Sequence, residues 1–322
     1  MIARLLAQLI LTTTLLTALP YDGALLEATA GLPVAGERNA SMVALQLVSS
    51  GYGFPRVSLD GPTKIDSLSL GIVTSAQSVL VMDVESGAIL YEKNPTADRA
   101  IGSITKLMTA LVFLERSPDL TAQVVIEDID VRDGGRLYLA VNDPVALGDL
   151  LKASLIGSDN SATIALVRFS GLDESSFVDA MNRKADELGM TNTIFTEPTG
   201  LSSQNRSTSY DLTKLVAAVE RQSEIQVLTT TSVATVTQKS GRTVTIDSTD
   251  DLLRSFINQT PFGMLAGKTG YLPEAGYGIA LAVEKEGEGR VYVVLLGSDS
   301  ITSRIQEVKG LVDWTYRVWD WN

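Results

Sequence analysis

The residues best suited to chemistry are Ser103 and Lys106, in the motif Ser103-Ile-Thr-Lys106. Residues three apart lie on one face of a helix, so the Lys106 amine can reach the Ser103 hydroxyl. At a helix start this hydroxyl also lies at the positive end of the helix dipole, which favours its ionised form. A lysine can take the hydroxyl proton when burial or a nearby cation lowers the pKa of the amine. The pattern predicts a nucleophile and its base, and the alternative is an N-cap serine followed by a solvated lysine.

Two further triplets carry groups that suit the same site. Ser158-Asp159-Asn160 falls between two expected helices, where a hydroxyl and an amide can point into a cleft. Lys268-Thr269-Gly270 leads into residues 275–283, which have the pattern of an edge strand and suit an extended peptide ending in a carboxylate. Each pattern also occurs elsewhere, in Ser203-Gln-Asn205 and Lys239-Ser-Gly241, which we interpret as a loop and a hairpin turn. Neither triplet is therefore specific by itself.

Composition excludes several other kinds of function. The 322 residues include no His and no Cys, which removes imidazole and thiolate zinc sites, thiol redox chemistry and histidine-based triads. With 26 Lys and Arg against 38 Asp and Glu, the net charge is −12, and we expect no nucleic-acid partner. The acidic cluster Asp128, Asp130 and Asp133 lacks the spacing of a calcium loop and is interpreted as a solvated loop. We expect neither a metal nor a cofactor.

The elements that must position these residues are two groups of strands with helices between them. Alternation and apolar runs predict strands over 78–83, 89–93, 233–237, 243–246, 278–283 and 290–296. Helical spacing predicts helices over 104–114, 145–155, 161–169, 177–188 and 209–222. We therefore expect a sheet built from distant segments and flanked by helices, a separate helical lobe, and a cleft between the two.

The closing stretch over 305–321 is amphipathic and holds all three tryptophans, Trp314, Trp319 and Trp321. We expect it to cover one side of the sheet. Contact with a membrane interface or with sugars is the alternative.

The N-terminus has the pattern of an export signal. Arg4 precedes a mostly apolar run over residues 5–20, which is short for a membrane span of about 20 residues. We expect residues 1–20 to be a signal peptide, with a retained membrane anchor as the alternative. Residues 21–74 are rich in Gly and Pro and are interpreted as a linker or prosegment. The catalytic domain is expected over residues 75–322.

Taken in order, the three motifs resemble those of the penicillin-recognising serine enzymes. Within that group the chain is most similar to the low-molecular-mass D-alanyl-D-alanine carboxypeptidases and endopeptidases, over about residues 78–319. The stretch Phe195-Thr-Glu-Pro-Thr-Gly-Leu-Ser202 is closest to the endopeptidases. The resemblance implies an α+β fold of the β-lactamase/transpeptidase kind, a mainly antiparallel sheet with the active site between sheet and helical lobe. The other specific stretches are 81–95, 102–110, 205–214 and 267–271.

The resemblance also implies a catalytic role for several residues. Ser103 would attack the carbonyl of the penultimate D-Ala and form an acyl-enzyme, with Lys106 as general base. Ser158 would pass a proton to the leaving amine, in a hydrogen-bond network with Lys106 and Lys268. The backbone N–H groups of Ser103 and Tyr271 would form the oxyanion hole.

Substrate contacts are implied in the same way. Asn160 would bind the amide side of the substrate, and Thr269 would help hold the terminal carboxylate. Lys268 would keep Lys106 neutral by repulsion between like charges. The partners implied are peptidoglycan stem peptides and, as covalent inhibitors, β-lactams. The enzyme would act in the periplasm or at the cell surface, either free after cleavage of the signal or, as the alternative, attached to the membrane through the N-terminal segment.

Two alternatives share this fold. A class A β-lactamase needs a Glu to activate the deacylating water, and Glu197 is a candidate. However, the residues around Glu197 match the peptidases, in which that Glu belongs to a structural turn. A catalytically inactive wall-binding protein would lack at least one of Ser103, Lys106 and Lys268, and all three are present.

Overall fold

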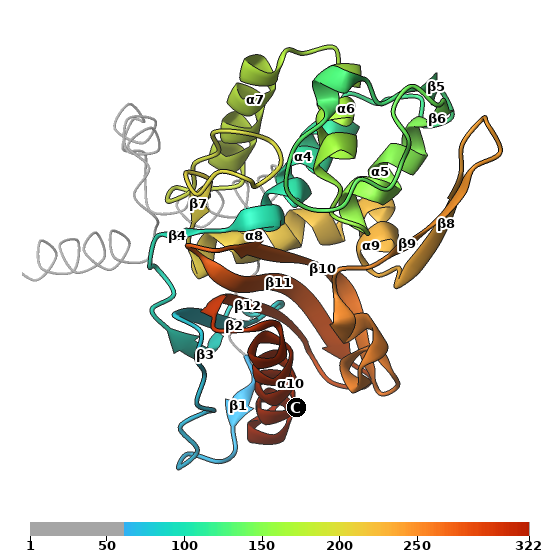
Figure 1. Cartoon of the computed structure of the whole chain (residues 1–322). Coiled ribbons are helices and arrows are strands. Elements are labelled where there is room, and N and C mark those ends of the chain that lie inside the picture. The colour runs from blue at the N-terminus through green and yellow to red at the C-terminus, as the bar shows by residue number, and fades with distance from the viewer. Residues whose placement is uncertain (1–60, 322) are drawn as a thin grey trace, which may run out of the picture. The chain divides into compact units, whose positions relative to one another are not determined.

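The centre of the molecule is a five-stranded antiparallel sheet (Figure 1). The structure is a computed structural model that describes residues 61–321, so the expected signal segment and residues 21–60 of the expected linker lie outside it. The strand order β10-β11-β12-β2-β3 joins an N-terminal hairpin to three strands from the end of the chain. The strands are β2 (Ser78–Asp83), β3 (Ile89–Lys93), β10 (Phe262–Leu272), β11 (Gly276–Lys285) and β12 (Arg290–Ser298).

Strand β12 shows why the sheet needs cover on both faces. Its run Val291-Tyr-Val-Val-Leu-Leu296 is buried throughout. Because successive side chains of a strand point to opposite faces, alternate residues enter different cores. Val291, Val293 and Leu295 belong to one core cluster, and the residues between them belong to the other. A strand buried on both faces is apolar without alternation.

Helices cover these two faces unequally. Helix α8 packs on β11 and β12 from the side of the helical lobe, and α10 packs on the same strands from the other side (Figure 1). Helix α4 lies inside the lobe, in contact with α5, α6, α7, α8 and α9, and is buried except for Leu114. The helices are α4 (Thr105–Leu114), α5 (Leu147–Leu155), α6 (Asn160–Phe169), α7 (Glu174–Glu187), α8 (Ser209–Glu220), α9 (Ser223–Thr229) and α10 (Ile301–Val318).

Short elements complete the described chain. Four two-stranded sheets pair β1 (Thr63–Lys64) with β13 (Trp319–Asp320), β4 (Arg99–Ala100) with β7 (Arg206–Ser207), β5 (Gln123–Val124) with β6 (Val145–Ala146), and β8 (Val233–Thr237) with β9 (Thr243–Asp247). The 3-10 turns are η1 (Gly102–Ile104), η2 (Asp128–Asp130), η3 (Asp251–Arg254) and η4 (Phe256–Asn258).

The expected α+β fold is confirmed, but the edge of the sheet was assigned wrongly. The strand that carries Lys268-Thr269-Gly270 is itself the edge strand, β10, whereas residues 276–285 form the interior strand β11. Sequence analysis did not predict β10 because its glycines and a lysine interrupt the β-branched, apolar pattern of a strand. Residues 145–146 also pair as β6 instead of opening a helix.

The three tryptophans cover one side of the sheet, as expected. The Trp314 indole donates to Ser69 Oγ and meets the Tyr91 ring edge-on. The Trp321 indole donates to Asp83 Oδ1, and Trp319 packs against the same core. Residues 61–74 were expected as the end of the linker. Parts of this stretch contact the domain, and β1 pairs with β13, while Leu68, Leu70 and Val73 are exposed.

The acidic stretch differs from the expected solvated loop at one position. Asp130 is 1 % exposed and receives hydrogen bonds from Arg168 at both carboxylate oxygens. No group of three or more carboxylates suited to a metal occurs within residues 61–321.

In the same range no helix has the length and hydropathy needed to cross a membrane.

The stability of the sheet should depend on α10. Leu311 is fully buried between this helix and the strands, so Leu311→Ala should lower the free energy of unfolding by about 3 kcal/mol, from lost transfer energy and the cavity left behind. Val227→Ala, at a side chain 61 % exposed, is the control and should change it by less than about 0.5 kcal/mol. Urea unfolding measures both, and equal values would contradict the role given to α10.

Candidate active site

The structure brings the predicted pair together. Ser103 lies in η1, one turn before the body of α4, and Lys106 follows in the first turn of that helix. Lys106 Nζ lies 3.0 Å from Ser103 Oγ, within hydrogen-bond distance. Ser103 is only half-buried, so a substrate can reach its hydroxyl, whereas Lys106 is fully buried.

The Lys106 amine is fully buried and bonds to three oxygens. Besides Ser103, it donates to Asn160 Oδ1 and to the backbone carbonyl of Thr199, each at 2.6 Å. Burial lowers the pKa of Lys106 from 10.5 to about 7, against the opposing effect of the Glu197 and Asp159 carboxylates. The expected cause, repulsion by Lys268, is therefore not the main one. Desolvation by itself is sufficient to make this amine a base near neutral pH.

A turn centred on Glu197 supplies the carbonyl that Lys106 binds. The Glu197 carboxylate accepts hydrogen bonds from the backbone N–H groups of Thr199 (2.7 Å) and Gly200 (2.6 Å) and from the Asn205 side chain (2.8 Å). These bonds fold the chain back so that Thr199 O faces the amine. Glu197 is thus the structural residue that the sequence resemblance implied, with its oxygens already occupied.

Two glycines let this turn and β10 approach Ser103 closely. A Cβ on Gly200, whose φ is +88°, would lie 2.0 Å from Gly102 O. A Cβ on Gly102 would lie 2.8 Å from the backbone nitrogen of Tyr271. No side chain fits at either position. The backbone N–H of Tyr271 on β10 consequently lies beside the backbone that leads into Ser103.

The Ser158 triplet reaches the site, but not through the expected network. Ser158 lines the pocket with a positive φ of 58°, and within residues 61–321 no hydrogen bond joins its hydroxyl to either lysine. Instead Asn160 bonds to Lys106 and donates to Gly134 O at 2.6 Å. Asn160, at the start of α6, thus makes the contact with the Lys106 amine that was expected of Ser158.

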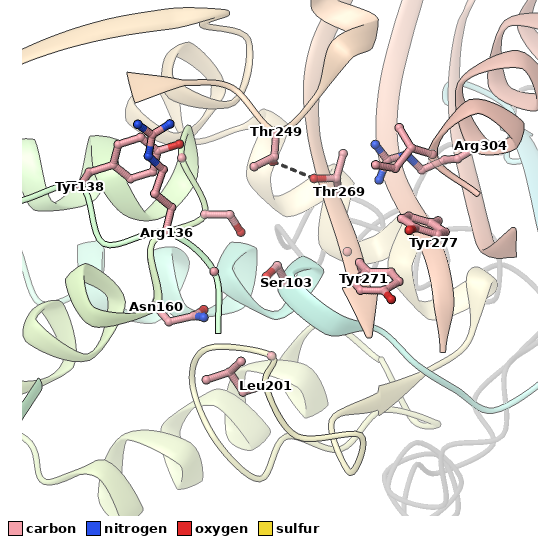
Figure 2. Close-up of a pocket in the computed structure, with 16 residues that line it drawn as sticks. Ser103, Arg136, Tyr138, Asn160, Leu201, Thr249, Thr269, Tyr271, Tyr277 and Arg304 are labelled. Carbon is pink, nitrogen blue, oxygen red and sulfur yellow. Dashed lines mark hydrogen bonds between the residues drawn. The ribbon is translucent and has the colours of Figure 1, made fainter. Parts of the chain in front are cut away.

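The second lysine lies on the edge strand. Lys268 is 2 % exposed and donates to Thr249 Oγ1 (3.2 Å) and to Thr269 O (3.4 Å). Burial lowers its pKa to about 7, with a further lowering by the charges of Lys106 and Arg304 and an opposing effect of Asp250. Thr269 Oγ1 shares a hydrogen bond with Thr249 Oγ1 at 2.8 Å (Figure 2).

These residues meet in a pocket of about 490 Å³ between the lobe and β10 (Figure 2). The pocket is lined by Ser103, Ser158, Asn160, Thr269 and Tyr271, as the sequence predicted. The two other copies of the triplet patterns are a loop at 203–205 and the turn of the β8–β9 hairpin, as expected. Sequence analysis missed Arg136, Tyr138, Leu201, Thr249, Tyr277 and Arg304, because they come from separate loops, strands and a helix and form no local motif.

A half-exposed serine bonded to a buried lysine whose pKa is lowered to about 7, in a cleft beside an edge strand, is the arrangement expected of a serine hydrolase with a lysine base. Residues 69–300 match the family described as D-alanyl-D-alanine carboxypeptidase. The chain belongs to this family of peptidases, which includes carboxypeptidases and endopeptidases.

Individual relatives agree with this assignment. The chain is 38 % identical over 206 residues to a D-alanyl-D-alanine endopeptidase of Haemophilus influenzae, covering 63 % of this chain and 69 % of that protein. It is 35 % identical over 224 residues to one of Pseudomonas aeruginosa, covering 69 % and 71 %. The crystal structure of penicillin-binding protein D2 from Listeria monocytogenes with cefotaxime bound is similar, with a TM-score of 0.66 and 29 % identity over 77 % of this chain and 100 % of that chain.

The lowered pKa values can be measured directly. In a chain labelled with ¹³C at the lysine ε-carbons, two signals should titrate near pH 7, where an exposed lysine stays protonated. Lys106→Met should remove one of them and Lys268→Met the other. Because the unfolded chain holds these protons up to about pH 10, the stability of the wild type should rise as the pH increases from about 7 to 10. A Lys106 signal that titrates above pH 9 would contradict the burial argument.

Proposed function

We propose that this chain is a serine D,D-peptidase that cleaves D-alanyl bonds of peptidoglycan stem peptides through an acyl-enzyme on Ser103. The observation that carries the proposal is the 3.0 Å hydrogen bond between Ser103 Oγ and an amine whose pKa is lowered to about 7. A neutral amine at that distance can take the hydroxyl proton as the oxygen attacks the substrate carbonyl.

The remaining steps need donors for the oxyanion and a proton for the leaving amine. The backbone N–H groups of Ser103 and Tyr271 stabilise the oxyanion, and one donor of this kind contributes about 3 kcal/mol to the transition state. Ser158 lines the same pocket and delivers the proton to the leaving amine. Water then releases the acyl group from Ser103.

The substrate binds along β10. Within the described residues this strand pairs with β11 alone, and an extended peptide can pair with its other edge beside the pocket. The terminal carboxylate is held by Thr269 and Lys268. Arg304 supports the same end, since its positive charge is among those that lower the pKa of Lys268. Within residues 61–321 the Asn160 amide donates one N–H, to Gly134 O, so its second N–H is available to the substrate amide.

Endopeptidase and carboxypeptidase cut the same type of bond and differ in the leaving group. Both relatives described above are endopeptidases, and the stretch over 195–202 resembles that subgroup. We therefore favour cleavage of cross-links. Such an enzyme works outside the cytoplasm, and the apolar N-terminal run is consistent with export, with or without attachment to the membrane.

The acyl-enzyme can be tested with Ser103→Ala. Benzylpenicillin should add one molecule's mass to the wild type, at the peptide that contains Ser103, and nothing to this variant, because Ser103 is the one hydroxyl of residues 61–321 that is hydrogen-bonded to the Lys106 amine. Ser203→Ala, in the loop that repeats the Ser-x-Asn pattern, is the matched control and should acylate like the wild type. Intact-mass spectrometry gives both results, and an adduct on Ser103→Ala would disprove the assigned nucleophile.

The lifetime of that adduct separates the peptidase from a β-lactamase. The Glu197 oxygens are occupied by N–H donors, and no carboxylate is among the residues that line the pocket, so the adduct should persist for minutes or longer. Glu197→Gln should leave the lifetime unchanged and lower the free energy of unfolding by about 1–3 kcal/mol, since an amide nitrogen then faces donors. Rapid turnover that Glu197→Gln abolishes would indicate a β-lactamase instead.

A further inference from the structure

The pocket wall opposite β10 carries an arginine that makes no polar contact within the described part of the chain. Arg136 is exposed, lines the pocket, and holds its guanidinium 4.8 Å from the centre of the Tyr138 ring. Among residues 61–321, neither a hydrogen bond nor an ion pair engages this guanidinium. By contrast, Arg132 in the same loop pairs with Glu174. Arg136 thus presents an uncompensated positive charge to the pocket.

The loop that carries Arg136 is fixed to the catalytic scaffold. The backbone N–H of Tyr138 donates to Asp159 Oδ2 (2.9 Å), and Gly134 O accepts from Asn160 (2.6 Å). On its other side, Ala140 N–H donates to the buried Gln238 (2.9 Å) from the β8–β9 hairpin. The backbone that carries the Arg136 guanidinium is therefore fixed before a ligand binds, which limits the conformational entropy lost on binding.

The charge of the pocket is opposite to that of the protein. The chain has a net charge of −12, yet the pocket is lined by two arginines and no carboxylate. Figure 2 shows Arg136 and Arg304 on opposite sides of Ser103. An anionic peptide can therefore be bound at two separate points, and only the Arg304 side is needed for the carboxylate next to the scissile bond.

We propose that Arg136, stacked on Tyr138, is a subsite for a second carboxylate on the leaving peptide and favours cross-linked substrates. The inference rests on the proposed function. The leaving amine is expected beside Ser158, and the loop lies against that residue, since a Cβ on Gly135 would lie 3.8 Å from Ser158 O. A single D-Ala has one carboxylate and does not extend to this wall. The leaving group of a cross-link is a second stem peptide, which carries further carboxylates past Ser158.

The test compares two substrates in the full-length protein. Arg136→Gln should lower kcat/KM for a cross-linked muropeptide dimer roughly tenfold, as expected for the loss of one charge-assisted hydrogen bond. Release of D-Ala from a monomeric pentapeptide and the rate of acylation by benzylpenicillin should stay within twofold. Arg136→Lys should recover part of the rate, because it keeps the charge without the planar fork. Arg132→Gln, in the same loop but outside the pocket lining, is the matched control and should behave as the wild type.

Ionic strength gives a second readout. Added salt should slow the wild type on the dimer more than it slows Arg136→Gln, since only the wild type has the charge contact to screen. If Arg136→Gln loses as much kcat/KM on the pentapeptide as on the dimer, or loses none on the dimer, the proposed subsite is wrong. A wild type that releases D-Ala but does not cut the dimer would also overturn it, while the proposed D,D-peptidase would stand. If the wild type processes neither substrate and is not acylated, the proposed function itself fails.

Discussion

The structure of the helical lobe is organised around one buried amine. Lys106 has no exposed surface, and a lysine in that position needs oxygen acceptors to compensate for its lost hydration. The chain supplies them from three segments: the turn before α4, the first residue of α6 and the carbonyl of Thr199. These segments are fixed in turn by the core around α4, by the Asp159 N-cap of α6 and by the Glu197 turn. Small shifts in any of them would leave the amine without a partner or open it to water.

A second buried lysine adds to the cost of burying charge at this site. Lys268 is also buried, and its pKa is lowered partly by the charge of Lys106. Burial lowers the pKa of each amine to about 7, so near neutral pH one of the two can be neutral while the other is charged. In the proposed mechanism, a chain without histidine thereby obtains from burial a base that works near neutral pH.

Sequence analysis could predict what depends on local spacing. The Ser103–Lys106 contact follows from one helical turn, and the fold class follows from apolar patterns and the order of the motifs. It could not predict Thr199 as a partner of Lys106, because a backbone carbonyl 93 positions away leaves no side-chain signature. Arg136 and Arg304 could not be predicted as pocket residues either, since only the packing of the fold places them there. Strand β10 was missed because the groups that serve the site, glycines and a buried lysine, are poor strand formers.

Helix α10 connects the pocket with the place where the described chain begins. Its first turn contributes Arg304 to the pocket, and its last residues lead into β13, which pairs with β1. A helix of 18 residues is about 27 Å long, at about 1.5 Å per residue. Strand β1 thus lies at the end of α10 that is remote from the pocket. A force applied at β1 would therefore act on the domain far from the pocket, and the opening of the pocket would stay clear for a bulky substrate.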